Sequence, residues 1–185
     1  KFHVTVDLNA NSNQATTIAT MPQELDELGC SHLGDPDYFE WNGQGYLFIP
    51  VHGTRELIDK CCNKLSFLAV FKDDLTYVGS TMFPVQKHGI ATGGVGWCAI
   101  SPLEGNLLHT SRNEIKAGQP VYRYRVDFDA LQNGDVVLTP RDDLVLVENN
   151  ASQNPVHIPK YVQGGAFSPN GWLYISSGKE TADTN

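Results

Sequence analysis

Three histidines precede expected β-strands in a repeated position, and they are the first candidates for chemistry in this chain. His32, His88 and His157 lie 11, 17 and 14 residues before three glycines that mark sharp turns. If the imidazoles converged, they could bind a divalent metal ion together with Asp35 or Asp37, and that ion could activate water or polarise a carbonyl. Alternatively, each histidine forms only a hydrogen bond to a neighbouring structural unit. The sequence leaves both interpretations open.

A cation followed closely by a glutamate forms a second recurring pattern. It occurs three times, as Arg55-Glu56, as Arg112 with Glu114, and as Lys179-Glu180. Such pairs could form a polar ring that binds a carboxylate or a sugar through bidentate guanidinium contacts. They could also be ion pairs between structural units, which would stabilise the fold only if partly buried. The residues predicted to form a ligand site are His32, Asp35, Arg55, Glu56, His88, Arg112, Glu114 and His157.

The four cysteines do not form a metal-binding pattern. No CxxC pair is present among Cys30, Cys61, Cys62 and Cys98, which argues against a zinc site of thiolates. A disulfide from Cys30 to Cys61 or Cys62 would form in an oxidising compartment and would restrain the intervening segment. Free thiols are the alternative. Cys98 stands within an expected strand and should behave as a small buried apolar residue.

The elements that would position these side chains are β-hairpins. Residues 166–177, AFSPNGWLYISS, place Asn-Gly between two apolar runs, which is the sequence typical of a type I′ turn. Similar hairpins occur in residues 100–111 and 39–51. Their turn glycines Gly43, Gly105 and Gly171 are 62 and then 66 residues apart. Three hairpins at this spacing indicate an internal repeat.

Short strands separated by turns account for most of the chain. The expected strands are residues 2–8, 16–20, 38–41, 46–51, 65–71, 77–83, 97–101, 106–110, 121–128 and 136–139, followed by the third hairpin. The residues between 21 and 37 are expected to form a loop. The single helix candidate, residues 23–28, is too short to be stable alone. The pattern therefore predicts an all-β protein.

The repeat favours a β-propeller of four-stranded antiparallel blades. The blade-like units are residues 1–20, 38–83, 97–139 and 166–185. They comprise two whole blades and two complementary halves, about three blades in one domain over residues 1–185. Propellers typically have at least four blades. Closing the ring would thus require the remainder of a longer chain or a second copy.

Two segments carry a resemblance to known propellers. AFSPNGWLYISSG resembles the inner hairpin of gluconolactonase-like and NHL-type propellers. HGIATGGVGWCAISPLEGNLLHTS, residues 88–111, is similar to the repeats of streptogramin-lyase-like propellers, which also place a histidine before the inner strand. The resemblance implies that the loops before strand one and after strand two share one face, around the mouth of a central channel. It matches no complete catalytic motif.

Charge and composition restrict the partners. With 13 Lys and Arg against 21 Asp and Glu, the net charge of −8 argues against nucleic acid, and no run of 18 apolar residues suits a membrane helix. The chain starts at Lys1 without a signal-like stretch, as expected of a processed or trimmed chain, and Asn150-Ala151-Ser152 is a glycosylation triplet. We expect a secreted or periplasmic protein.

Three functions fit these features. The leading hypothesis is binding of a small polar molecule, such as a carbohydrate, at the channel mouth. The alternatives are a metal-assisted hydrolase or lyase that uses the loop histidines, and a protein-interaction scaffold. The sequence does not decide whether the protein is an enzyme.

Overall fold

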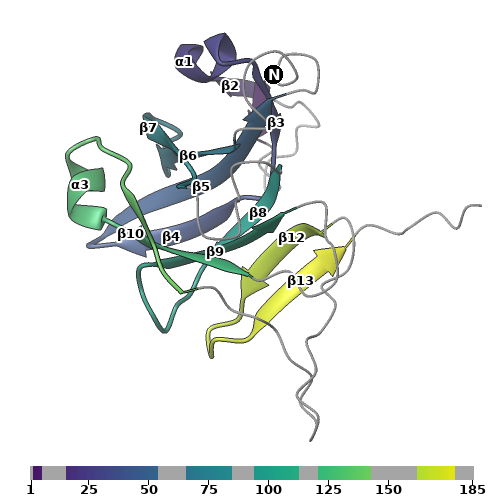
Figure 1. Cartoon of the computed structure of the whole chain (residues 1–185). Helices are drawn as coiled ribbons and strands as arrows, with labels where there is room; N and C mark the ends of the chain where they lie inside the picture. Colours follow the sequence, from purple (N-terminus) through teal and green to yellow (C-terminus); the bar gives the residue numbers. More distant parts are fainter. Residues whose placement is uncertain are drawn as a thin grey trace, which may run out of the picture.

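The structure is almost entirely β. The computed structural model describes residues 2–5, 16–53, 66–84, 94–112, 121–142 and 162–177, which contain thirteen strands and two five-residue helices (Figure 1). All strand pairs within the sheets are antiparallel. The prediction of an all-β protein is therefore confirmed.

Four sheets follow one another along the chain. The first is a ribbon of β1 (Phe2–Thr5) and β2 (Thr16–Thr20). The second, five-stranded, comprises β3 (Cys30–Leu33), β4 (Asp37–Trp41), β5 (Gln44–Gly53), β6 (Ser66–Lys72) and β7 (Tyr77–Met82). The third, four-stranded, comprises β8 (Val95–Ile100), β9 (Leu107–Arg112), β10 (Tyr122–Val126) and β11 (Leu138–Pro140). The fourth is a ribbon of β12 (Val162–Phe167) and β13 (Leu173–Ser177).

Both larger sheets have the predicted meander order. The four-stranded sheet runs β8-β9-β10-β11, and the five-stranded sheet continues from β5 through β6 to β7. β3 and β4 both pair with β5, β3 along its C-terminal end and β4 along its N-terminal half. The prediction of a loop over residues 21–37 was wrong, because this segment holds β3 as well as a helix, α1 (Gln23–Glu27).

The hairpin turns differ from one another. Asn42 and Gly43 both have positive φ and connect the paired residues Trp41 and Gln44, which fits the type I′ geometry. Around Gly171 the connection is longer: the Ser168 amide donates to the Trp172 carbonyl at 2.9 Å, and only Gly171 has a positive φ there. The prediction of a type I′ turn was therefore wrong for this hairpin.

A second helix replaces the end of a predicted strand. β10 ends at Val126, and α3 (Phe128–Gln132) follows where a strand was expected to continue to Phe128. The Asp127 carboxylate accepts a hydrogen bond of 2.9 Å from the Ala130 amide, which caps the first turn of the helix. Phe128 and Leu131 are buried on its inner side.

The five-stranded sheet, the four-stranded sheet and the β12–β13 ribbon pack against one another in chain order, and β8 lies between its neighbours at the centre (Figure 1). All six of its residues are buried. Cys98 and Ile100 belong to the main core, which they share with β5, β6, β9 and β10, whereas Trp97 and Ala99 pack against the β12–β13 ribbon. Because alternate residues of a strand face opposite sides, β8 must be apolar throughout. The prediction that Cys98 is a small buried apolar residue is confirmed.

Candidate functional site

A pair of histidines marks one end of the five-stranded sheet. His32 on β3 and His52 near the end of β5 are direct partners in the antiparallel register, and their ring centroids are 4.3 Å apart. His32 is exposed and His52 is partly buried. Gly94, just before β8, lies against the second imidazole, because a Cβ added there would stand 3.4 Å from His52 Nε2. The four-stranded sheet therefore reaches this histidine pair.

Asp35 joins three sheets at the same end. Its amide donates to the Gly96 carbonyl at 2.8 Å, and its own carbonyl accepts from the Cys98 amide at 3.2 Å. Its exposed side chain reaches β12: a Cβ on Gly164 would lie 2.6 Å from Asp35 Oδ2 and 2.8 Å from Ser176 Oγ. Only glycine at position 164 leaves room for this carboxylate and this hydroxyl together.

Asp37 has a different role. Its carboxylate accepts a hydrogen bond of 2.6 Å from the Ile100 amide on β8, and burial raises its pKa. This contact ties the five-stranded sheet to the four-stranded sheet. Of the two aspartates considered from the sequence as partners of the histidines, Asp35 is thus the one with an exposed side chain.

The structure therefore describes two of the predicted site residues, His32 and Asp35, and gives each of them a neighbour that the sequence reading did not select. His52 lies beside His32, and Ser176 approaches Asp35 around Gly164. His52 became recognisable only through its register opposite His32, which required β3 to be identified. Ser176 became recognisable only through the approach of β12 and β13 to Asp35. No local pattern marks either residue.

The other predicted site residues stay untested. Arg55, Glu56, His88, Glu114 and His157 lie outside the described residues, and of Arg112 only the backbone, at the end of β9, is described. Where side chains are described, no group of three or more His, Cys, Asp or Glu could hold a metal ion. A divalent metal at His32, His88 and His157 remains a prediction.

The predicted disulfide also involves residues outside the described part of the chain. Cys30 is a buried free thiol on β3 whose pKa is raised by burial, and its predicted partners, Cys61 and Cys62, lie outside the described residues. The pairing remains a prediction.

Taken together, the described side chains offer a mixed set of polar groups. A neutral imidazole carries one donor and one acceptor, the Asp35 carboxylate accepts through two oxygens, and the Ser176 hydroxyl does both. Adjacent hydroxyl groups of a sugar or polyol match such a set, because each can donate to a carboxylate and accept from an imidazole.

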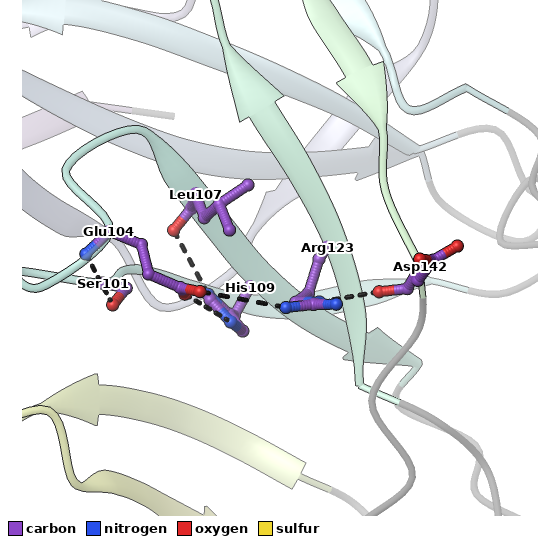
Figure 2. A network of polar contacts seen from close by, with 6 residues as sticks. All are labelled: Ser101, Glu104, Leu107, His109, Arg123 and Asp142. Carbon is purple, nitrogen blue, oxygen red and sulfur yellow. Dashed lines mark hydrogen bonds and ion pairs between the residues drawn. The ribbon is translucent and has the colours of Figure 1, made fainter.

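A separate polar network lies at the β8–β9 turn, on the side of the four-stranded sheet that faces β12 and β13 (Figure 2). Glu104 Oε2 is 3.9 Å from His109 Nε2, and Glu104 Oε1 is 3.9 Å from Arg123 Nη1. Arg123 Nε also donates to the Asp142 carbonyl at 2.6 Å. His109 is only 2 % exposed, its Nδ1 is 3.2 Å from the Leu107 carbonyl, and its ring meets Phe167 edge-on.

Burial of His109 should make the fold sensitive to acid. Burial lowers the pKa of this imidazole below its ordinary value, outweighing the Leu107 carbonyl and Glu104, which raise it. In the unfolded chain a histidine titrates near about 6.5. As the pH falls below that value the unfolded state takes up the proton first, so stability is lost down to the lower pKa of the folded state. We expect His109→Gln to flatten the decline of unfolding free energy below about pH 6.5. Denaturant melts at several pH values measure this, and a His109 resonance titrating above 6.5 would contradict it.

Comparison with family models, with curated proteins and with solved structures finds no match to this chain. In the part of the chain that the structure describes, neither helix has the length and apolar character needed to cross a membrane. The fold thus defines the class as far as an all-β protein with face-to-face antiparallel sheets, and the candidate site is argued from its own residues.

Proposed function

We propose that the chain is part of a β-propeller, and that it binds a small polar ligand, such as a carbohydrate, at the end of the sheets that carries the His32–His52 pair and the neighbouring side chains of Asp35 and Ser176. Support for the propeller comes from the order of the sheets. Two meanders lie between a ribbon at each end, and their inner strands are neighbours in space, since Asp35 and Trp97 form a parallel bridge and β8 contacts β12. Radially arranged blades have these features.

The observation that carries the ligand site is the meeting of three sheets at Asp35. Residues near the starts of β8 and β12 and near the ends of β5 and β13 contribute to it, as expected when the segments before strand one and after strand two share a face. Sites tend to form where several such segments converge on a rigid scaffold. In a secreted or periplasmic protein, this face would meet sugars and other small polar solutes.

The ring would be closed by strands beyond those described. Among the described residues, β13 pairs only with β12 and β1 pairs only with β2, so each ribbon presents a second edge. We propose that these edges are where the remainder of a longer chain, or a second copy, completes the propeller.

Loss of the Asp35 carboxylate is expected to weaken ligand binding. Glycan arrays followed by calorimetry on the best hit would give the affinity. Asp35→Asn should raise its Kd at least about tenfold, because a hydrogen bond to a charged group contributes about 1.5–3 kcal/mol. His32→Ala should raise it up to about tenfold, because a hydrogen bond between neutral groups contributes about 0.5–1.5 kcal/mol. Asp26→Asn, an exposed aspartate on α1, is the matched control and should leave the Kd unchanged.

Two results would overturn this assignment. One is binding that is unaffected by both Asp35→Asn and His32→Ala. The other is a protein that binds no small polar solute and instead retains a stoichiometric divalent metal, lost on His32→Ala. The latter result would support the metal-assisted hydrolase or lyase, which the proximity of His32 and His52 also allows.

A further inference from the structure

A polar pocket lies at the end of the sheets opposite the histidine pair. It has a volume of about 250 Å³, and its polar wall consists of Trp41, Asn106, Arg125, Asp127, Asp129 and Thr139. Trp41 is paired with the first residue of β5 and His52 is the ninth residue of that strand, so the two sites are roughly 25 Å apart along an extended chain. The pocket is therefore independent of the histidine pair.

An aromatic cluster holds the pocket wall in place. The Trp41 indole stacks on Phe128, with ring centroids 4.7 Å apart and planes 17° apart. Phe128 in turn contacts Phe39, Tyr46 and Phe48 at centroid distances of 5.5, 6.2 and 6.1 Å. Rings packed this closely have few alternative rotamers, so the wall is formed before any ligand arrives.

A buried donor of this wall is left without a partner. Among the described residues Trp41 Nε1 has no hydrogen-bond partner, and solvent does not reach it. Leaving a buried donor unpaired costs about 1–3 kcal/mol. A rigid wall keeps a ligand oxygen as far from this nitrogen as it keeps solvent, so a ligand in the pocket would contact the partly exposed Trp41 ring and not its N–H.

Three other polar side chains around the pocket have no hydrogen-bond or ion-pair partner among the described residues. Arg125 and Thr139 are cross-strand partners on β10 and β11 and both are exposed; in the described part of the chain neither side chain forms an ion pair or hydrogen bond. Asp129 is likewise exposed, and its backbone carbonyl accepts a hydrogen bond from the Asn133 side chain at 2.9 Å, while its carboxylate has no partner among the described residues. Asp127 differs, because its carboxylate caps α3 and helps to fix the wall.

From these contacts we infer that the pocket binds one ring of a neutral monosaccharide, or a cyclic polyol of that size. Both donors and acceptors line it: the Arg125 guanidinium donates, the Asp129 carboxylate accepts, and Asn106 and Thr139 do both. Aromatic rings provide an apolar wall for the C–H face of a sugar. The volume lies just below the range of about 300–1,000 Å³ typical for drug-sized ligands, which suits a single ring.

The indole N–H signals test this site directly. The chain has three tryptophans, so a ¹H–¹⁵N spectrum shows three indole signals. Titration with glucose, galactose, mannose and myo-inositol should move the Trp41 signal saturably. The Trp97 signal should stay fixed, because Trp97 Nε1 donates to Ser111 Oγ at 2.7 Å in the buried interior.

Matched variants connect the signal to the pocket. Arg125→Ala and Asp129→Asn should each raise the Kd read from Trp41 about tenfold. Arg141→Ala, an exposed arginine outside the pocket, and His32→Ala at the distant site should leave it unchanged. A Trp41 signal that no tested sugar or polyol moves at millimolar concentration overturns the inference. So does a response to acetate or inorganic phosphate alone, which would make this an anion site. Because His32→Ala affects only the first site, failure of either proposal can be distinguished from failure of the other.

Discussion

Replacement of Trp97 by alanine is expected to lower the free energy of unfolding by about 3–5 kcal/mol. Trp97 on β8 is completely buried and belongs to the hydrophobic cluster between the four-stranded sheet and the β12–β13 ribbon. Its removal would leave a cavity where two sheets meet and would unpair the buried Ser111 hydroxyl from the indole. With a total stability of about 5–15 kcal/mol for a typical domain, a loss of this size would leave a substantial unfolded population.

The surroundings of Trp97 cannot close over such a cavity. Gly165 on β12 lies directly against the indole, since an added Cβ would stand 2.3 Å from Trp97 Cε3, so the ring itself fills the space between the two strands. Collapse into the emptied space is opposed by the hydrogen bonds that Gly96 and Cys98, on either side of Trp97, form with Asp35. The full cavity cost, rather than a relaxed fraction of it, should therefore be observed.

Trp172→Ala is the matched control. Its side chain is 68 % exposed beside β13, and its loss should change the unfolding free energy by no more than about 0.5 kcal/mol. Denaturant titrations followed by circular dichroism give both values. Equal effects of the two substitutions would show that β8 and β12 do not pack as described.

The periodic parts of the sequence predicted the fold well. Alternation and turn glycines located most of the strands, because both follow from local geometry: side chains alternate along a strand, and Gly43, Gly105 and Gly171 all have positive φ. The strand order within the two meanders followed from the short connections. All of this is information that residues carry about their immediate neighbours.

What the sequence did not reveal depends on contacts between distant segments. β3 has only four residues and no clear alternation, and it is stabilised by its pairing with the end of β5. Trp97 is buried whereas Tyr38 and Trp172 are exposed, and this difference depends on where the next sheet lies, which the sequence does not reveal. The pairing of His32 with His52 was missed for the same reason.

The segment around α3 carries two conflicting local signals. The aromatic and β-branched residues up to Phe128 favour a strand, which is why a strand was predicted there, whereas Asp127 at the N-cap position indicates the start of a helix. Burial of Phe128 favours the helix over the strand, because the helical turn places this ring in the main core, among rings from β4 and β5.

Phe128→Ala provides a sharp test of that explanation. We expect the free energy of unfolding to fall by about 3–5 kcal/mol, since the substitution empties the centre of the aromatic cluster. Intrinsic helix propensity acts in the opposite direction, because alanine favours a helix over phenylalanine by less than about 0.7 kcal/mol. A net loss of several kcal/mol would therefore come from packing and not from the helix itself.

The control and the second readout separate packing from local structure. Gln132→Ala on the same helix is exposed and should change stability by no more than about 0.5 kcal/mol. Because Trp41 stacks on Phe128, its indole N–H signal should also shift in Phe128→Ala, whereas that of Trp97 should stay in place. A stabilised Phe128→Ala protein would mean that helix propensity outweighs the ring contacts, and α3 would then be a locally determined element instead of one imposed by the core.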